Sequence, residues 1–231
     1  MSASAPCRGV PNDFQALASR SPPVSAALYG EAPESGLARF DVFEFPPFVV
    51  GKSRQAAIIG AYDFSKFRRI ADIGGGEGGL LSAVLEAAPI ANGILFDQPR
   101  AVEAARRTLA NKAVSDRIDF VAGDFFDAVP KGAELYVLKQ ILHDWDDEHA
   151  EKILATCRRS MLAGSRLLVL EMMIEPNVAF PKRLDLMMMA WTGGRERTQD
   201  QFDRIFAKTG FSLIGTRRTT MPICVLEAQP A

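Results

Sequence analysis

The sequence predicts an α/β fold: a doubly wound, mostly parallel sheet that ends in an antiparallel hairpin. Three observations predict it. Short apolar runs alternate with stretches of helical periodicity between residues 51 and 208, which is typical of a parallel sheet covered on both faces. The first run breaks into a glycine-rich turn at 72–79. The last two runs, 211–217 and 223–228, are joined by too few residues for a crossover, so they must pair antiparallel.

The expected strands are the short apolar runs, and most of them end at a polar residue or a glycine. The helices are expected between them, because their apolar residues recur at helical spacing; Leu81, Val84 and Leu85 are one such stripe. Pro99 suits the first turn of a helix, and the acids at 144–147 suit a helix N-terminus. The parallel strands are expected at 69–73, 93–96, 118–122, 134–138 and 166–170, and the helices at 51–62, 78–88, 99–110, from 147 onward and at 199–208.

Length and composition bound the domain organisation. The chain has 231 residues and is 48% hydrophobic, which allows one large domain or one domain with an appendage. Residues 1–47 are rich in Pro, Ser, Ala and Gly and are expected to form a partly ordered arm, with the main domain at 48–231. A local aromatic cluster at the end of this arm is expected to pack on the core, to wall a pocket or to join two subunits; it consists of Phe40, Phe43, Phe45 and Phe48.

Charge and cysteine usage narrow the function classes. A net charge of −1 gives no electrostatic case for nucleic acid or an anionic membrane as a partner. No apolar run reaches the length of a membrane span, and the N-terminus lacks the order of a signal peptide. Cys7, Cys157 and Cys224 are far apart and no Cys/His cluster suggests a metal. The expected location is therefore a reducing cytoplasm, with no metal centre.

The glycine-rich turn fits two motifs. Gly74, Gly76 and Gly79 satisfy the dinucleotide pattern G-x-G-x-x-G. Asp72 with Gly74, Gly76 and Gly78 also satisfies D-x-G-x-G-x-G, which resembles the first motif of S-adenosylmethionine-dependent methyltransferases. In either reading the glycines let a ligand approach the backbone, and the helix that follows offers unpaired N–H groups. The glycines alone do not choose between the two ligands.

Polar residues follow the predicted strands where ligands of open α/β sheets bind. Asp97 lies ~20 residues past the glycines, where an acid can hold ribose hydroxyls; it could instead cap the helix at Pro99. Asp124 could accept from an exocyclic amine such as that of adenine, or it could be an ordinary turn acid. A third acid in the series favours a mononucleoside over a dinucleotide. The full series is Asp72, Asp97, Asp124, His143 and Glu171.

The sequence contains two histidines, and only one follows a predicted strand. An imidazole at the His143 position can take a proton from a hydroxyl near pH 7; the alternative is a surface loop histidine beside helix-capping aspartates. His149 falls inside the next helix, on or near its polar side, and is expected to be solvated.

Five blocks in this order resemble the S-adenosylmethionine-dependent O-methyltransferases of the plant caffeate and bacterial polyketide-tailoring type. The resemblance extends over about residues 51–228. The blocks are Asp72-Ile73-Gly74-Gly75-Gly76, Phe96-Asp97-Gln98-Pro99, Gly123-Asp124-Phe125-Phe126, Leu138-Lys139-Gln140-Ile141-Leu142-His143-Asp144-Trp145 and Gly193-Gly194-Arg195-Glu196-Arg197-Thr198.

The resemblance implies a role for each of these blocks. Asp72, Gly74 and Gly76 would form the turn that holds S-adenosylmethionine, with the two glycines passing close to its methionine part. His143 would be the general base on a hydroxyl of a small aromatic or polyketide-like acceptor, and Glu171 and Glu196 would flank and orient it. The resemblance further implies that Asp97 binds the ribose, Asp124 and Phe125 the adenine, Lys139 the polar end of the cofactor, and Met187, Met188 and Trp191 the acceptor.

Two departures from the family bear on these expectations. The family has a substantial helical N-terminal domain that dimerises and closes the acceptor pocket, and only the arm at 1–47 stands in that place, so a homodimer is one possibility among others. Glu77, in the glycine turn, would either pair with cationic groups of the cofactor or point to solvent. Two other functions stay open: a relative that binds the cofactor without methylating, as a scaffold subunit, and a nicotinamide-dependent oxidoreductase, disfavoured by Asp124 and the terminal hairpin.

Overall fold

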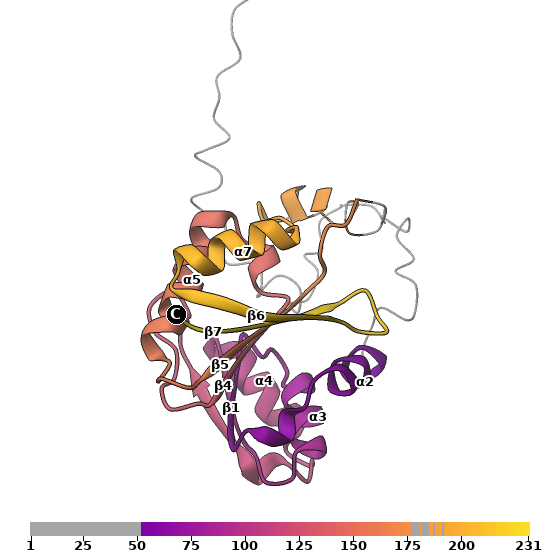
Figure 1. Cartoon of the computed structure of the whole chain (residues 1–231). Helices are drawn as coiled ribbons and strands as arrows, with labels where there is room; N and C mark the ends of the chain where they lie inside the picture. The colour runs from indigo at the N-terminus through magenta and orange to yellow at the C-terminus, as the bar shows by residue number, and fades with distance from the viewer. Residues whose placement is uncertain (1–51, 177–180, 182–184, 187, 191) are drawn as a thin grey trace, which may run out of the picture. The chain divides into compact units, whose positions relative to one another are not determined.

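A seven-stranded sheet in the order β3-β2-β1-β4-β5-β7-β6 forms the centre of the fold (Figure 1). In this computed structural model the structure describes residues 52–176, 181, 185–186, 188–190 and 192–231, which all belong to one compact unit. The predicted arm at 1–47 and its phenylalanine cluster lie outside the described residues. The strands are β1 (Arg69–Ile73), β2 (Asn92–Asp97), β3 (Ile118–Ala122), β4 (Leu135–Lys139), β5 (Arg166–Glu171), β6 (Phe211–Arg218) and β7 (Cys224–Pro230).

The strand pairing confirms the predicted mixed sheet. β1 pairs in parallel with β2 and β4, and β3 and β5 extend the parallel part on either side. β7 pairs antiparallel with β6, as the short connection between these two strands required. It also pairs antiparallel with β5. The predicted bounds of β1 and β3 coincide with the observed ones, and those of the other strands differ by one or two residues. Ile223 lies just before β7, and β7 continues past Ala228 because Pro230 pairs with Phe211 at the far end of β6.

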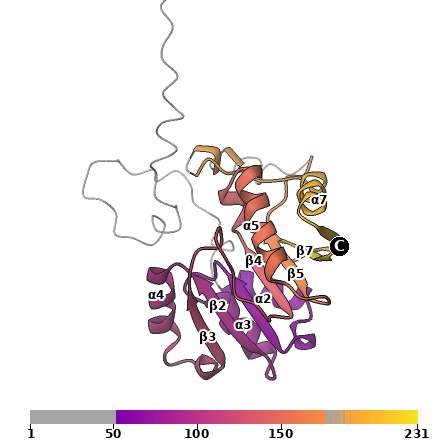
Figure 2. The ribbon, with the colours of Figure 1, turned by 90° about the vertical axis from the view of Figure 1, so that its left-hand side faces the viewer.

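Helices cover both faces of the sheet, as the alternating pattern predicted (Figure 2). α2 (Lys52–Ala61), α3 (Gly79–Ala87) and α4 (Pro99–Leu109) pack on one face, and α5 (Asp147–Ser160) and α7 (Gln199–Lys208) pack on the other. Thr198 and Gln201 form a capping box at the start of α7, and Asp146 caps α5. Three short 3-10 helices complete the described elements: η3 (Phe64–Lys66), η4 (Ser115–Arg117) and η5 (Leu142–Asp144).

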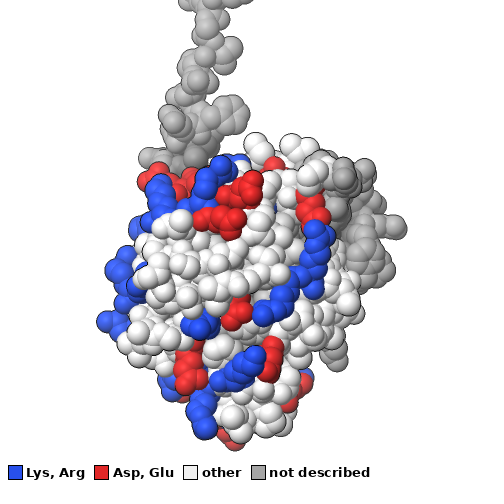
Figure 3. Space-filling model, in the orientation of Figure 1, with Lys and Arg blue, Asp and Glu red and all other residues white. Residues whose placement is uncertain are grey.

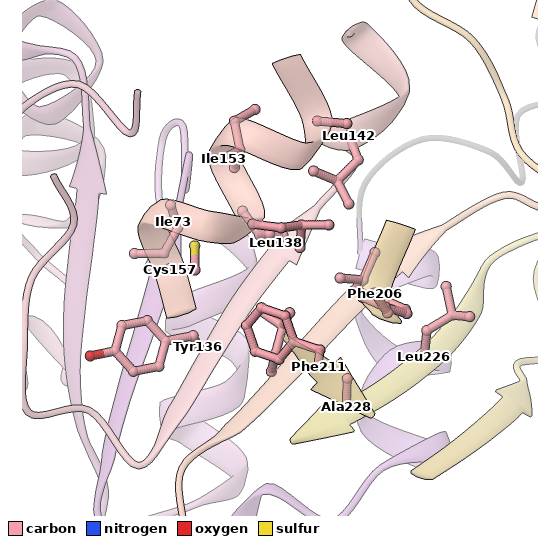
Figure 4. Packing of buried hydrophobic residues seen from close by; sticks show 14 of the residues in the cluster. Ile73, Tyr136, Leu138, Leu142, Ile153, Cys157, Phe206, Phe211, Leu226 and Ala228 are labelled. Atoms are coloured by element: carbon pink, nitrogen blue, oxygen red, sulfur yellow. The ribbon is translucent and has the colours of Figure 1, made fainter. Parts of the chain in front are cut away.

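Two buried apolar clusters, one on each face, hold these layers together. The cluster beneath α5 and α7 includes Leu138 and Leu142, which lie on either side of the site described below, and Figure 4 shows them packed with Ile153. The other cluster holds α3 through Leu81 and Leu85, both of which the sequence placed on the inner stripe of this helix. The carboxyl ends of β1, β2, β4 and β5 are thus fixed from both sides.

Arg117 holds together the C-terminal end of α3. One guanidinium nitrogen donates to the carbonyl of Leu85 at 2.8 Å, and the other donates to that of Ala91 at 2.7 Å and to that of Ala88 at 3.2 Å. The last carbonyls of a helix have no partner within the helix, so a single half-buried arginine here replaces several missing hydrogen bonds.

The surface carries both signs of charge. Figure 3 shows basic and acidic side chains interleaved around a broad uncharged band on this face. Ion pairs join Arg218 to Glu175 at 2.9 Å and Arg217 to Glu227 at 3.1 Å. None of the helices in the described part of the chain is long and apolar enough to cross a bilayer.

Candidate active site

The parallel strands bring the predicted polar residues to one edge of the sheet. β2, β1, β4 and β5 are consecutive in the sheet, and Asp97, Lys139 and Glu171 are the last residues of three of them. Asp72 is the next-to-last residue of β1, paired with Val137 of β4. The sequence positions that ended apolar runs are therefore neighbours in space, as expected for an open α/β sheet.

The glycine turn after β1 leaves open space beside its backbone. Gly74, Gly76 and Gly78 have φ angles of +72°, +56° and +77°, which glycine adopts at little cost. A Cβ at Gly76 would meet no atom within 4 Å, whereas one at Gly74 would lie 2.4 Å from the side chain of Ile141. The turn thus packs tightly against the loop after β4 and is open at Gly76. Glu77 is exposed.

Asp72 provides an unpaired acceptor under this turn. Its side chain is buried, and its Oδ2 has no hydrogen-bond partner among the described residues. Burial, opposed by the charge of Lys139 and supported by the nearby carboxylate of Asp97, raises the pKa of Asp72 to about 6. A buried carboxylate without a partner is costly, so the pocket favours a ligand that brings a cationic or N–H group to it.

Asp97 fastens the glycine turn to the start of α4. One oxygen accepts from the backbone N–H of Gly76 at 2.8 Å, and the other accepts from that of Gln98 at 2.7 Å. Gln98, not Asp97, is the N-cap of α4, so the alternative of a capping acid is wrong. A carboxylate oxygen can accept more than one bond, so both oxygens keep capacity toward ribose hydroxyls.

Asp124 and Phe125 follow β3. Asp124 is exposed, and its Oδ1 accepts from the N–H of Phe126 at 2.8 Å, which is the geometry of an ordinary turn acid. The ring of Phe125 is half-buried, 6.1 Å from that of Trp145, and it borders Gly74. The structure therefore brings Phe125 to the glycine turn and leaves Asp124 toward solvent.

The end of β4 contains Gln140, a residue that the sequence analysis did not single out. Gln140 has a φ of +54° although it is not a glycine, and its side chain accepts a hydrogen bond from Arg54 of α2. Lys139 beside it is mostly buried, and this burial lowers its pKa, although Asp72 opposes the shift. A backbone conformation of this kind is uncommon outside glycine and is often found at functional sites. The helical periodicity of α2 gave no indication that Arg54 would contact Gln140.

His143 lies in η5, just past β4, and it is buried. The alternative of a surface loop histidine is therefore wrong. Its Nδ1 lies 2.8 Å from Oε1 of Glu196 and 3.9 Å from Oε2 of Glu171, and an oxygen of Asp144 lies 3.6 Å from its Nε2. Because Nδ1 faces the two glutamates, Nε2 is the nitrogen that a substrate can reach. His149 is exposed, as expected.

The two glutamates hold His143 in different ways. Glu196 bonds the imidazole directly, whereas Oε1 of Glu171 accepts from the backbone N–H groups of Ile141 and Leu142 at 3.0 and 2.9 Å. Both side chains are buried, and the second oxygen of each has no partner among the described residues. The ligand atoms of His143, Glu171 and Glu196 lie within 4.8 Å of one another, a spacing that a metal ion could also use, but a hydrogen bond already joins two of the three.

The electrostatics of this group favour a proton on the imidazole. Burial lowers the pKa of His143, but the charges of Glu171 and Glu196 and the hydrogen bond to Glu196 outweigh it and raise the pKa to about 9. Burial in turn raises the pKa of Glu171 to about 7, opposed by the charge of His143. The arrangement is built to stabilise an imidazolium, which is the product of proton abstraction.

Two further residues at this site were missed by sequence reasoning. Arg197 is 1% exposed and bonds the loop that contains His143. Gly194 lies so close to the same loop that a Cβ would be 2.1 Å from the carbonyl oxygen of His143. Both fall within the block Gly193–Thr198, but an arginine in a polar block gives no signal of burial. Of the residues expected near the acceptor, Met188 is buried, and Met187 and Trp191 lie outside the described residues.

The fold is Rossmann-like, of the class I methyltransferase type, with a glycine-rich turn and a buried histidine at the same edge of the sheet. The family model of the O-methyltransferase domain matches residues 52–212. The chain belongs to this family of S-adenosylmethionine-dependent O-methyltransferases, and the resemblance in the sequence is confirmed.

The similar relatives with assigned functions include both an O-methyltransferase and a hydroxylase. The phenazine O-methyltransferase PhzM of Lysobacter antibioticus is 45% identical over 75% of this chain and 52% of its own length. Aclacinomycin 10-hydroxylase RdmB of Streptomyces purpurascens is 38% identical over 70% of this chain and 45% of its own. The chain spans about half the length of the relatives it matches.

A solved structure of an O-methyltransferase is also similar to this chain. An O-methyltransferase from neocarzinostatin biosynthesis, NcsB1, in complex with S-adenosylmethionine and 2-hydroxy-5-methyl naphthoic acid, is similar with a TM-score of 0.71. It is 32% identical, and the match covers 76% of this chain and 53% of that one.

Proposed function

We propose that this chain transfers a methyl group from S-adenosylmethionine to a hydroxyl of a small aromatic or polyketide-like molecule, with His143 as the general base. The observation that carries the proposal is the buried imidazole of His143 against Glu196, at the sheet edge where the glycine turn lies. Family membership supports methyl transfer as the reaction.

The described residues fit the cofactor. Asp72 has an unpartnered buried oxygen for a cationic group, and the open side of Gly76 admits a ligand next to the backbone. When bound, S-adenosylmethionine supplies a methyl group already activated by its sulfonium. The residues that would hold it are Asp72, Gly74, Gly76, Asp97, Asp124, Phe125 and Lys139.

The protein's own part in the reaction is alignment and proton removal. The acceptor hydroxyl gives its proton to Nε2 of His143, while Nδ1–H stays bonded to Glu196. The carboxylates of Glu196 and Glu171 stabilise the resulting imidazolium. A base in such a position contributes roughly 10²–10⁴-fold, and alignment of the reacting groups contributes several kcal/mol more.

The acceptor class follows from the relatives. NcsB1 was solved with a hydroxylated naphthoic acid and PhzM is named for phenazines, so a fused or single aromatic ring with a hydroxyl is the class we propose. Met187, Met188 and Trp191 are proposed to contact it. A homodimer that completes the acceptor pocket, and a cytoplasmic location, stay predictions.

The alternative of a cofactor-binding relative that does not methylate is not favoured. PhzM and NcsB1 are named O-methyltransferases, although RdmB is named a hydroxylase. The test incubates the chain with S-adenosylmethionine and a panel of hydroxylated naphthoates, phenazines and catechols, and detects methylated product and S-adenosylhomocysteine by mass spectrometry. We expect turnover on at least one phenol, and its loss in His143→Gln with cofactor affinity retained. Cofactor binding without turnover on any of them would overturn methyl transfer in favour of the binding role.

A further inference from the structure

Arg197 makes an unusual set of contacts for an arginine. Its side chain is 1% exposed, in a part of the fold where a buried charge needs full compensation. Nη1 donates to the carbonyl of Leu142 at 2.6 Å, Nη2 donates to the carbonyl of Trp145 at 2.9 Å, and Nε donates to a carboxylate oxygen of Asp147 at 2.9 Å. One guanidinium therefore joins three points along a six-residue stretch that includes His143.

Residues outside this stretch form hydrogen bonds with the backbone groups on both sides of the histidine. Glu171 accepts from the N–H of Leu142, and Arg197 donates to the carbonyl of the same residue. The carbonyl of His143 itself accepts from the backbone N–H of Arg195 at 2.9 Å. A 3-10 turn as short as η5 has little stability of its own, so these partners determine where its side chains point.

Glu196 and Arg197 act on the same histidine from adjacent positions. Arg197 pairs with Met173 in a short parallel bridge, and its carbonyl accepts from the N–H of Ile174, so the segment is extended just beyond β5. Successive side chains of an extended segment point in opposite directions. Glu196 thereby reaches the imidazole while Arg197 reaches the backbone of the same turn.

We propose that Arg197 is a positioning residue for His143: by fixing the carbonyls of Leu142 and Trp145 it sets the orientation of the imidazole against Glu196. It acts through the loop and touches neither cofactor nor acceptor. The role requires an arginine, because only the planar fork presents separate donors to two carbonyls and a carboxylate at once. A lysine could keep the charge but would satisfy one of these acceptors well and leave the others unpaired.

The chain offers a matched control two residues earlier. The side chain of Arg195 lies 3.4 Å from the second oxygen of Asp147 and is 42% exposed. Like Arg197, it pairs with the carboxylate of Asp147. Among the hydrogen bonds of the described residues, its side chain donates to neither the carbonyl of Leu142 nor that of Trp145. Arg195→Lys therefore makes the same arginine-to-lysine change beside the same carboxylate without removing a donor from the turn.

The decisive measurement is the NMR titration of the imidazole in each variant. The chain has two histidines, so His149→Gln assigns the remaining signal to His143. Glu171, Glu196 and Asp144 are the charged groups that face this imidazole, and none of them is changed in the variants. In Arg197→Lys the imidazole loosens from Glu196, and its titration midpoint should fall by about one pH unit or more toward the ordinary histidine value. In Arg195→Lys it should not move.

Turnover gives the second readout, and this part alone rests on the proposed function. Arg197→Lys should lower kcat about 10- to 100-fold with the cofactor Kd unchanged, because misplacement of a catalytic group costs rate and not ground-state affinity. If the parent shows no turnover, the proposed function fails while the titration still decides the role of Arg197.

The meaning of the titration depends on whether the variant folds. A folded Arg197→Lys with an unshifted imidazole titration overturns the proposal, since the arginine would then be structural only. If Arg197→Lys does not fold, Asp147→Asn is the second variant, because it removes the carboxylate that orients the guanidinium at a half-exposed position. A folded Asp147→Asn with the parent's titration midpoint would equally overturn it, and a midpoint lowered by a few tenths of a unit supports it.

Discussion

Nδ1 of His143 and Oε1 of Glu196 lie 2.8 Å apart, although 53 positions separate the two residues in the sequence. This contact joins the end of β4 to the segment just before α7. The contact occupies Nδ1, so Nε2 is the ring nitrogen outside this hydrogen bond. The protonation of the imidazole and its orientation therefore depend on the same carboxylate.

The first prediction concerns the pH dependence of methyl transfer. The pKa of His143 is raised to about 9, so the free base becomes more abundant as the pH rises, and kcat/KM should increase across the range from about 6.5 to 9. In Glu196→Gln the lost carboxylate lowers this pKa, so the rising limb should move to lower pH. The plateau at high pH should be lower, because the imidazolium is less stabilised.

A pH–rate profile of the parent and the variant checks this. The loss of rate in Glu196→Gln should be larger at pH 9 than at pH 7. His143→Gln should lose roughly 10²-fold or more at neutral pH and recover partly near pH ~10, where a phenol ionises by itself. Superimposable profiles for parent and Glu196→Gln would contradict the assigned base.

The second prediction concerns stability. A histidine with a folded-state pKa of about 9 and an unfolded value of 6.5 stabilises the native state below pH 6.5, and this contribution is lost as the pH rises through 9. The shift corresponds to about 3 kcal/mol at most. Urea unfolding of the parent should show a decline in the free energy of unfolding between pH 7 and 9.5, and His143→Gln should show a flatter dependence. Parallel curves for both proteins would disagree with the raised pKa.

The third prediction concerns the stability and the cofactor affinity of Asp72→Asn. The buried carboxylate has an unpartnered oxygen and a pKa raised to about 6, so its ionised form destabilises the native state at neutral pH. The amide removes this cost, and the variant without cofactor should have an unchanged or higher Tm than the parent. Its affinity for S-adenosylmethionine should fall about 10-fold or more, because a cationic group loses its counter-charge.

Differential scanning calorimetry and isothermal titration check the two effects of Asp72→Asn separately. Glu103→Gln is the control, since Glu103 is a surface acid that is 73% exposed and pairs only with Arg107 among the ion pairs of the described residues. It should change neither quantity. Unaltered cofactor affinity in Asp72→Asn would argue against a role of this acid in binding.

The fourth prediction compares two glycine substitutions. In Gly194→Ala the new methyl would lie 2.1 Å from the carbonyl oxygen of His143, so η5 must move and turnover should fall about 10²-fold. Gly60→Ala is the matched control: the new methyl meets nothing within 4 Å and lies in α2. It should stabilise the protein by up to about 1 kcal/mol through helix propensity. Chemical denaturation and initial rates measure both.

The fifth prediction separates folding from function. Arg117→Ala removes hydrogen bonds to the carbonyls of Leu85, Ala88 and Ala91, far from the histidine. The free energy of unfolding should fall by about 2–4 kcal/mol, because several hydrogen bonds from a charged donor to backbone carbonyls are lost at once. Below the unfolding transition the cofactor affinity should match the parent. Arg107→Ala, which breaks only an exposed pair with Glu103, should cost about 0.5 kcal/mol or less.

Much of the fold could be predicted from the sequence because the central parallel strands β1, β2, β4 and β5 are almost entirely buried. Runs such as Leu135–Lys139 are apolar on both faces and end at the sheet edge, so position along the run gives position in space. The same logic placed Asp72, Asp97 and Glu171 together. The terminal hairpin could be predicted from the short connection between β6 and β7, because a crossover does not fit into so few residues.

The rest of the site depends on contacts that periodicity does not encode. Arg197 and Glu196 are adjacent charged residues in a polar block, and only their pairing with distant partners buries them. Gln140 adopts a positive φ without being a glycine, so composition gave no warning of it. The function of Asp97 in fastening the glycine turn likewise required the hydrogen bond to Gly76.

The place of β7 bears on how the protein matures on the ribosome. β7 is synthesised after every other described strand, yet it lies inside the sheet between β5 and β6, with Cys224 opposite Glu171. β1, β2 and β3 emerge first and pair with one another. Until β7 is synthesised, the edge of β5 that it covers stays open, and β6 has no neighbouring strand through which to join the sheet. The seven-stranded sheet is therefore completed by the strand that is made last.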